Sequence, residues 1–344
     1  MSRESPTSQS TPLPLIDLSP LSSPNPTSHT VASLSTALST AFSTTGFAYL
    51  THVPLNCTDT EVFSLARKFF SLNDEQKMSV ARNIFRKVNG NTYRGYFPAQ
   101  KGEDNLKEGF EMGSADRKRK GNQVRDTKKG AGFDLEEENV WPTGFSAERT
   151  KLEKLHAELQ ALSGRLLSLL AMALEKEEGY FDEYMTDSLS TLRLLHYPAP
   201  NTKQQDLCCT PHTDSGILTL LHQDATGGLE VLSSDEKSWI PAPYIPNSIV
   251  VNVGDLMSRI SGGRFKATMH RVRSSPGRER FSVPFFFEPG RECVIRSVGE
   301  EGDGGVVYGR HVLEKMRGWV EFGDEGGEEV REEMERGREV LVEA

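Results

Sequence analysis

The sequence predicts a mainly β protein with flanking helices, built as a sandwich or a jelly roll. Seven short β-prone segments follow one another between residues 191 and 296, each bounded by Gly, Pro, Asn or Asp. A long amphipathic helix precedes them, and an apolar stripe of such length usually packs against a sheet. A jelly roll pairs strands that are distant in sequence, so residues far apart along the chain can meet in one site.

Composition and charge narrow the class of protein. The chain has 344 residues, of which 36% are hydrophobic and 26% charged, and this is enough to bury a sizeable core. A net charge of −9 argues against a nucleic-acid partner, which would require a basic face. No apolar run reaches the roughly 20 residues that span a bilayer. We expect a small-molecule substrate, no nucleic-acid or membrane partner, and a cytoplasmic monomer.

The cysteines and the first residues agree with a cytoplasmic location. Cys57, Cys208, Cys209 and Cys293 show no framework spacing, and we expect free thiols in a reducing compartment. Residues 1–12 are rich in Ser, Thr and Pro and contain no apolar stretch. We therefore expect a disordered tail rather than a secretory signal.

Short strands and helices alternate in the first part of the chain. Residues 13–18 favour a strand, and apolar residues recur at helical spacing over Ser28–Ser43. Residues 47–50 are β-prone, and regularly spaced apolar residues around Phe63 and Phe69 mark a second helix. The polar, glycine-rich stretch 121–138 is predicted to be an exposed loop. The basic run Arg117–Lys120, although typical of a nuclear-import patch, is interpreted as a solvated loop.

The longest predicted helix opens the second half of the chain. Leucines at steps of three and four predict it from Ser146 to about Lys176. The strands follow, and a helix near residues 308–320 precedes an acidic segment to which we assign no chemistry. The expected strands are residues 191–197, 216–222, 229–232, 248–253, 266–272, 281–288 and 293–296.

A candidate metal site starts at His212-Thr213-Asp214. Successive residues of an extended segment point to opposite sides, so His212 and Asp214 share a face. A second imidazole, His270, lies in a distant predicted strand. Two histidines and one carboxylate form the facial ligand set that suits Fe(II) and leaves neighbouring positions open for small molecules. The pattern predicts a catalytic iron at these three residues.

Arg280 and Ser282 form a second candidate group at the start of a hydrophobic strand. By the same alternation their side chains share one face. A guanidinium binds a carboxylate through two parallel hydrogen bonds, and a hydroxyl two residues away can donate a third. The pair therefore predicts a carboxylate-binding clamp beside the metal.

In their order and separation, His212-Thr213-Asp214, the distal His270 and Arg280-Phe281-Ser282 resemble the iron- and 2-oxoglutarate-dependent oxygenases of the isopenicillin-N-synthase-like family. The resemblance implies a double-stranded β-helix core of the jelly-roll, cupin-like type. It also implies Fe(II), 2-oxoglutarate as cosubstrate, and O₂. Arg280 and Ser282 would then hold the distal carboxylate of 2-oxoglutarate. Tyr197 aligns with a family tyrosine that hydrogen-bonds the same carboxylate, although it stands in Leu-His-Tyr-Pro instead of the plant-type Asn-Tyr-Tyr-Pro.

The resemblance also divides the chain into regions. Residues 13–145 resemble the helical cap region of the family and follow the tail 1–12. The other expected regions are the backing helices 146–190, the Fe(II)/2-oxoglutarate jelly-roll core 191–300, and a C-terminal helix with an acidic tail over 301–344.

The implied activity is the oxidation, most often hydroxylation, of a small organic molecule with release of succinate and CO₂. One alternative is a same-fold oxidase that does not use 2-oxoglutarate, like isopenicillin N synthase or the ethylene-forming type, because such enzymes keep the Arg-x-Ser pair. A non-catalytic metabolite-binding protein is a further alternative, which the retention of all three ligands disfavours. Residues 194–199, 220–224 and 227–229 are similar to microbial and fungal members, among them thymine hydroxylase-like and secondary-metabolite enzymes, and this likeness does not select a substrate. It leaves His196 and His222 open between pocket contacts and structural roles.

Overall fold

The computed structural model describes residues 13–23, 25–99, 107–115, 133–199, 207–299 and 304–316. Four predicted features fall wholly or mainly outside these ranges. They are the N-terminal tail, the basic run Arg117–Lys120, most of the loop 121–138, and the acidic C-terminal segment.

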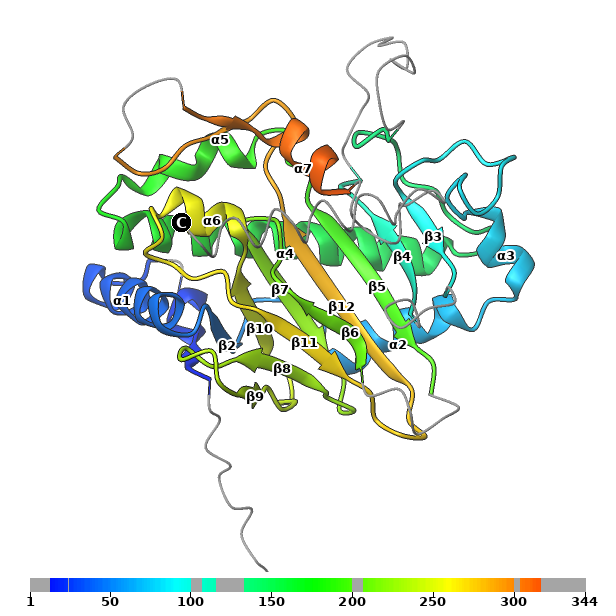
Figure 1. Cartoon of the computed structure of the whole chain (residues 1–344), viewed down its shortest axis with the longest axis horizontal. Coiled ribbons are helices and arrows are strands. Elements are labelled where there is room, and N and C mark those ends of the chain that lie inside the picture. Colours follow the sequence, from blue (N-terminus) through cyan, green and yellow to red (C-terminus); the bar gives the residue numbers. More distant parts are fainter. Residues whose placement is uncertain are drawn as a thin grey trace, which may run out of the picture.

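Two sheets form the centre of the molecule (Figure 1). The main sheet has eight strands in the order β1-β2-β10-β7-β12-β5-β4-β3, and the second sheet has four in the order β6-β11-β8-β9. Most neighbours in both sheets are distant in sequence, as a jelly roll requires. The predicted double-stranded β-helix core with flanking helices is therefore confirmed.

The main sheet comprises β1 (Leu15–Asp17), β2 (Phe47–Thr51), β10 (Ile249–Val253), β7 (Leu218–Gln223), β12 (Arg280–Phe287), β5 (Thr191–Tyr197), β4 (Glu108–Met112) and β3 (Gly95–Phe97). The second sheet comprises β6 (Leu207–His212), β11 (His270–Arg273), β8 (Leu229–Leu232) and β9 (Trp239–Pro241), and β13 (Val294–Ile295) pairs with β14 (Val306–Val307).

Helices cover one face of the main sheet. The long helix α4 (Ser146–Ala173) packs against α1 (Ser28–Thr44) and β12, and α2 (Asp59–Phe70) contacts β12 and β5 (Figure 1). A capping box fixes the start of α2, where Thr58 and Glu61 bind each other's backbone N–H groups. The remaining helices are α3 (Asp74–Ser79), α5 (Asp182–Met185), α6 (Asp255–Ile260) and α7 (Tyr308–Met316), with 3₁₀ turns η1 (Ser19–Ser22) and η2 (Glu178–Phe181).

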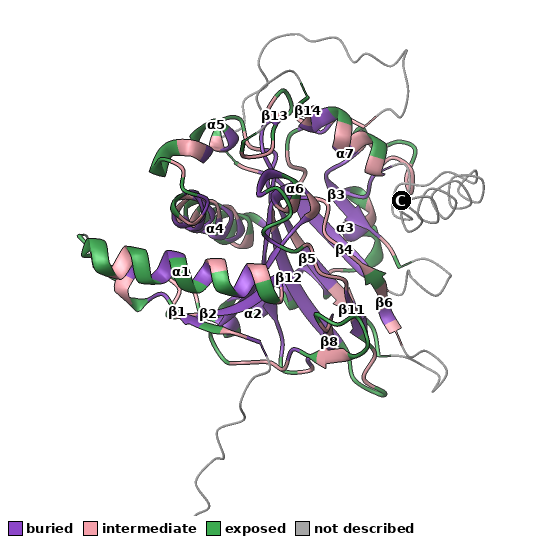
Figure 2. Cartoon of the chain, turned by 60° about the vertical axis from the view of Figure 1, so that its left-hand side comes forward, coloured by how far each residue is buried: buried purple, intermediate pink, exposed green. Residues whose placement is uncertain are grey.

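The two faces of the main sheet bury different side chains. Phe281, Val283 and Phe285 of β12 belong to the large apolar core under the helices. Leu195 and Tyr197 of β5 belong to a second apolar cluster that includes residues of the second sheet. Because side chains alternate along a strand, Arg280 and Ser282 share this second, inner face. Figure 2 shows how continuously buried residues follow these strands.

Most predicted elements occur at the predicted positions. The strands 191–197 and 229–232 match β5 and β8, and the helix from Ser146 ends at Ala173. The strand expected over 266–272 begins only at His270. The residues before His270 form other backbone hydrogen bonds: the Lys266 N–H donates to the Phe42 carbonyl near the end of α1, at 2.9 Å. β6 and β9 were not predicted as strands, and the segment 13–145 contributes β1–β4 to the main sheet.

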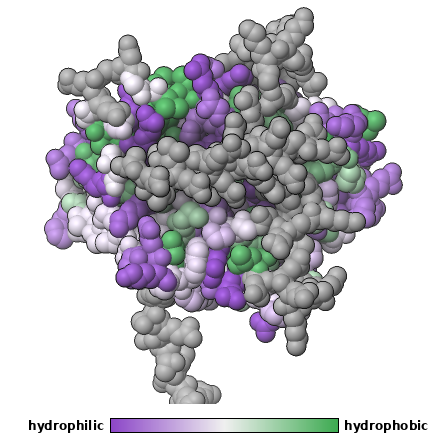
Figure 3. All heavy atoms as spheres, in the orientation of Figure 1, coloured by the Kyte–Doolittle hydropathy of each residue, from purple (hydrophilic) through white to green (hydrophobic). Residues whose placement is uncertain are grey.

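The surface carries mixed polar and apolar side chains. On the face shown in Figure 3, the coloured residues are a mixture of hydrophilic side chains and small hydrophobic areas. No helix in the described part of the chain combines the length and apolar character that crossing a bilayer requires.

Candidate functional site

His212, Asp214 and His270 meet between the two sheets. His212 ends β6, Asp214 follows two residues later, and His270 begins β11 directly opposite His212 in the antiparallel register. One potential ligand atom from each residue lies within 4.8 Å of the others. The Nε2 atoms of His212 and His270 lie 3.9 and 3.7 Å from Asp214 Oδ1. The strand pairing thus brings His270 next to His212 and Asp214, although His212 and His270 are 58 positions apart in the sequence (270 − 212).

Backbone carbonyls orient both imidazoles. His212 Nδ1 lies 2.8 Å from the Thr210 carbonyl oxygen, and His270 Nδ1 lies 3.1 Å from that of Thr268. A carbonyl can only accept, so each Nδ1 carries the proton and each Nε2 keeps its lone pair for a ligand. The ring of His270 also packs edge-on against Phe47, with 5.3 Å between the ring centres. The sequence could not indicate these carbonyls, because any residue supplies one.

The carboxylate of Asp214 is oriented in the same way. Its Oδ2 accepts hydrogen bonds from Thr219 Oγ1 at 2.6 Å and Asn252 Nδ2 at 2.7 Å, which leaves Oδ1 facing the imidazoles. Burial acts to raise the pKa of Asp214, but the two imidazoles and these hydrogen bonds outweigh it and lower the pKa. The carboxyl group of Asp214 is therefore ionised at neutral pH.

The two imidazoles differ in their affinity for a proton. Burial, assisted by the charge on His212, lowers the pKa of His270 to about 4. Burial also acts to lower the pKa of His212, but Cys209 and Asp214 outweigh it and raise the pKa. A metal ion at this site would have to displace a proton from His212, so its binding should strengthen as the pH rises.

Arg280, Ser282 and Tyr197 form one group on the inner face of the main sheet. Arg280 Nη1 donates to Ser282 Oγ at 3.0 Å, and Arg280 Nε donates to the Gly227 carbonyl at 2.7 Å. The guanidinium carbon lies 4.9 Å from the ring centre of Tyr197, which pairs with Arg280 in the β12–β5 register. The three side chains are buried. Tyr197 therefore contacts the guanidinium through its ring face, a role that its sequence position alone did not indicate.

His196 and His222 lie away from this group, on the helix-covered face. His196 lies 2.8 Å from Glu108 through Nδ1 and 3.2 Å from Glu279 through Nε2, and its ring stacks on Phe281. His222 Nδ1 lies 3.2 Å from Asp59 Oδ1 at the start of α2. Both residues connect elements of the fold, so of the two roles left open the geometry favours the structural one.

Sequence reasoning missed the residues that support Asp214. Asn252 is a polar residue inside the apolar strand Ile249–Val253, and this contrast is a signal that could have identified it. Thr219 shares the inner face of β7 with Leu221 and Gln223 by alternation, but threonine is common in strands and gives no comparable signal.

Two imidazoles, once His212 has given up its proton, and one ionised carboxylate are a donor set that fits Fe(II). Three protein ligands do not fill the coordination shell of Fe(II), so a bound ion would keep positions open for other molecules. An arginine with a neighbouring hydroxyl on the same inner face can bind a carboxylate. The arrangement can thus support metal-dependent chemistry on a small molecule.

Comparison with known proteins gives the same result. Residues 188–289 match the 2OG-Fe(II) oxygenase superfamily, and residues 13–144 match the family described as non-haem dioxygenase in morphine synthesis N-terminal. The 2-oxoglutarate-dependent dioxygenase citB of Monascus ruber is 33% identical over 325 residues, which cover 88% of this chain and 94% of citB. The 2-oxoglutarate-Fe(II) type oxidoreductase hxnY of Emericella nidulans is 32% identical over 68% of each chain.

Solved structures extend the likeness to the whole fold. The crystal structure of full-length Neurospora crassa T7H in complex with alpha-KG and thymine has a TM-score of 0.72 and 26% identity, covering 88% of this chain and 96% of T7H. A putative 2OG-Fe(II) oxygenase family protein from Caulobacter crescentus has the same TM-score and identity, covering 90% and 99% of the two chains. This chain belongs to the 2OG-Fe(II) oxygenase superfamily and is a 2-oxoglutarate-dependent dioxygenase that uses Fe(II), as its sequence motifs predicted.

Proposed function

We propose that His212 and His270 hold Fe(II) through Nε2 and that Asp214 holds it through Oδ1. One observation carries this assignment. In each of the three side chains the other polar atom is engaged by a protein hydrogen bond, and the two Nε2 atoms lie 3.9 and 3.7 Å from Asp214 Oδ1. Separations of this size are too long for hydrogen bonds but short enough for one cation to bind all three atoms.

Arg280 and Ser282 bind the distal carboxylate of 2-oxoglutarate in this proposal. The hydrogen bond to Gly227 and the ring of Tyr197 hold the guanidinium, so its planar fork is oriented before the cosubstrate arrives. Burial raises the pKa of Tyr197, although Arg280 opposes it, so the phenol stays protonated and can donate a hydrogen bond.

We infer that the reaction is the hydroxylation of a small organic molecule. Fe(II) held by His212, Asp214 and His270 would supply the activation of O₂, coupled to the decarboxylation of 2-oxoglutarate. One oxygen atom enters succinate, CO₂ leaves, and the second oxygen atom replaces a substrate C–H bond by C–OH. The protein orients both reactants, and the apolar inner cluster around Leu195, Val231 and Val272 limits the access of water.

Similar proteins support a small organic substrate. Crystals of Neurospora crassa T7H contain thymine or 5-formyluracil, and clavatol oxidase claD of Penicillium crustosum is 32% identical to this chain over 316 residues. The monomeric state and the cytoplasmic location expected from the sequence stay predictions.

Succinate release tests the proposed function. The purified protein would be loaded with Fe(II) and 2-oxoglutarate without oxygen, then exposed to O₂ with fractions of a metabolite extract. We expect O₂-dependent succinate release that one or more fractions raise above the background. Consumption of O₂ and substrate without succinate would instead favour the same-fold oxidase, and no O₂-dependent reaction at all would favour a metabolite-binding protein.

A further inference from the structure

His196 bridges two carboxylates on the helix-covered face of the main sheet. Its Nδ1 lies 2.8 Å from Glu108 Oε1 of β4, and its Nε2 lies 3.2 Å from Glu279 Oε2. An ionised carboxylate can only accept, so both ring nitrogens can donate only when the imidazole carries a second proton. The geometry of this bridge therefore corresponds to an imidazolium.

Glu108 is the firmly held end of the bridge. Its Oε2 accepts from Tyr96 Oη of β3 at 2.7 Å and from Lys77 Nζ of α3 at 2.9 Å, and its side chain is 11% exposed. Burial acts to raise the pKa of Glu108, but the hydrogen bonds from His196, Tyr96 and Lys77 outweigh it and lower the pKa. Glu108 is therefore an ionised acceptor that three elements hold in place.

Glu279 is the loosely held end of the bridge. Its side chain is 58% exposed, and residues 274–279, between β11 and β12, form neither a helix nor a strand. The loop after β7 also holds this segment, since Thr226 Oγ1 donates to the Glu279 carbonyl at 3.0 Å. Glu279 directly precedes Arg280, the residue proposed to bind 2-oxoglutarate. Through His196, the side chain of Glu279 thus attaches the segment before Arg280 to β5.

Further charged groups lie around the bridge on the helices. Arg67 of α2 lies over the ring of Phe281, on which the His196 ring stacks with 4.6 Å between the ring centres. Lys77 Nζ lies 3.6 Å from Asp74 Oδ1, also on α3. Of the residue types in this group, histidine is the one that ordinarily exchanges a proton near neutral pH.

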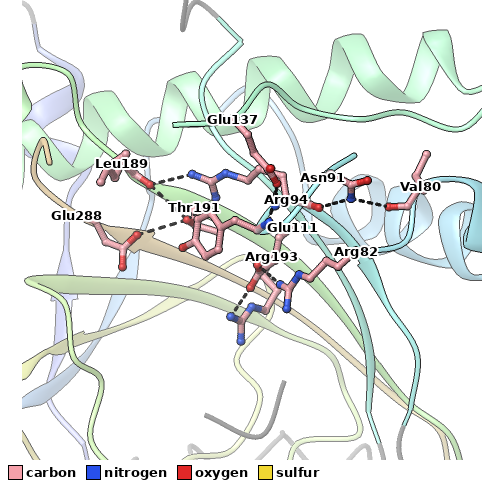
Figure 4. Close-up of polar contacts among 11 residues, drawn as sticks. Val80, Arg82, Asn91, Arg94, Glu111, Glu137, Leu189, Thr191, Arg193 and Glu288 are labelled. Atoms are coloured by element: carbon pink, nitrogen blue, oxygen red, sulfur yellow. Dashed lines mark hydrogen bonds and ion pairs between the residues drawn. The ribbon is translucent and has the colours of Figure 1, made fainter. Parts of the chain in front are cut away.

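A second charge pair on the same two strands has a different chemistry. Glu111 lies opposite Arg193 in the β4–β5 register, just as Glu108 lies opposite His196. Figure 4 shows Arg82 and Arg193 converging on Glu111. Guanidinium groups stay protonated in proteins, so this pair keeps its charges when the pH changes. An imidazole in the corresponding position makes the Glu108 pair sensitive to pH.

We propose that His196 is a positioning residue that makes 2-oxoglutarate affinity depend on pH, because it holds Glu279 only while its imidazole is protonated. The inference rests on the proposed function, since it takes Arg280 as the group that binds the cosubstrate. A neutral imidazole has one N–H donor, so loss of a proton breaks one of the two hydrogen bonds. The exposed Glu279 can turn to water, whereas Glu108 is enclosed by its other donors. Deprotonation thus releases the segment before Arg280, whose guanidinium is then less well preorganised for a carboxylate.

Calorimetric titration with 2-oxoglutarate at two pH values tests the proposal without turnover. The full chain would be saturated with Fe(II) in the absence of O₂ and titrated at about pH 6 and about pH 8.5, which bracket the ordinary pKa of histidine. Saturation with Fe(II) at both pH values removes the effect of the proton that metal binding displaces from His212. We expect the affinity to be about two- to fivefold weaker at the higher pH, as is typical of one partly exposed ion pair. Equal affinities, or tighter binding at the higher pH, would overturn the inference.

Substitutions separate this bridge from a merely structural contact. Glu279→Ala removes the exposed end, so 2-oxoglutarate should bind at both pH values as weakly as it binds to the wild type at the higher pH. Glu279→Gln should bind it at both pH values as tightly as the wild type does at the lower pH, because an amide accepts from an imidazolium and donates to a neutral imidazole. His196→Phe, which keeps a ring on Phe281, should match Glu279→Ala. A pH dependence that persists in the Glu279 variants contradicts the proposal.

Asp17 provides the matched control. It lies 2.8 Å from His52 Nδ1 and its side chain is 52% exposed, so it repeats the partly exposed carboxylate–imidazole pair on the edge strand β1. Asp17→Asn should leave the pH dependence intact, and its loss there would overturn the assignment to His196 and Glu279.

The same titration distinguishes failure of this inference from failure of the proposed function. Binding of 2-oxoglutarate that does not change with pH would contradict the inference alone. No binding at either pH would contradict the proposed function, and the inference with it.

Discussion

Histidines on the two faces of the main sheet have different surroundings. On the helix-covered face, His196 has both ring nitrogens within hydrogen-bond distance of carboxylates, Glu108 at 2.8 Å and Glu279 at 3.2 Å. On the side of the inner face, His212 and His270 use Nδ1 for a backbone carbonyl and direct Nε2 toward Asp214 at distances too long for a hydrogen bond. Residue type and burial are therefore poor guides to a ligand, whereas the convergence of several available ligand atoms on one point is a good one.

The faces should also differ in what a substitution changes. We expect side chains under the helices to contribute mainly to the free energy of unfolding, and those of the inner face to contribute mainly to the binding of metal and cosubstrate. The predictions below test this contrast, starting with the largest expected effect.

Asp214→Ala should reduce succinate release to the background level while the protein stays folded. The substitution removes the charged ligand and leaves the Thr219 hydroxyl and the Asn252 amide without their acceptor, so we expect a small decrease of the melting temperature and a protein that still unfolds cooperatively. Succinate assays and thermal unfolding check the two parts. Normal turnover by this variant would contradict the metal assignment.

Asn252→Ala should weaken Fe(II) binding by about 10- to 100-fold, as is typical for residues that orient a metal ligand. The variant keeps all three ligands but removes the 2.7 Å hydrogen bond to Asp214 Oδ2. Metal titration under anaerobic conditions measures the change, and excess Fe(II) should restore part of the activity. Unchanged metal affinity would show that Thr219 alone orients the carboxylate.

Arg280→Lys should raise the 2-oxoglutarate concentration required for half-maximal succinate release by about tenfold or more. An ammonium keeps the charge but cannot form two parallel hydrogen bonds, and a hydrogen bond to a charged group contributes about 1.5–3 kcal/mol. The dependence of succinate release on 2-oxoglutarate checks this. An unchanged requirement would remove the argument that Arg280 binds the cosubstrate.

Ser282 and Val283 are successive residues whose side chains lie on opposite faces of the main sheet, so substitutions at these two positions compare the faces most directly. Ser282→Ala should raise the required 2-oxoglutarate severalfold with little change in stability. Val283 is 0% exposed in the core under the helices, so Val283→Ala should cost about 2 kcal/mol of unfolding free energy and leave the cosubstrate requirement unchanged. Denaturant unfolding and 2-oxoglutarate titration of both variants separate the effects. If both variants changed the same property, the two faces would not be functionally distinct.

Local patterns in the sequence predicted the elements and much of the candidate site. Leucine spacing gave the helix from Ser146, and alternation placed Arg280 with Ser282 and His212 with Asp214. These predictions succeed because the periods of helices and strands are local properties of the chain. The closure of the jelly roll came from the resemblance to a family, since periodicity does not specify which strands pair.

Only the tertiary structure determined the contacts between distant strands. The register that sets His270 opposite His212, the hydrogen bond from Asn252 to Asp214, and the pairing of Arg193 with Glu111 all join segments far apart in sequence. Strand register depends on the packing of both sheets together, and no local pattern contains it. The sequence by itself therefore determined which residues could form the proposed iron and 2-oxoglutarate site, and the fold decided which of their atoms converge between the sheets.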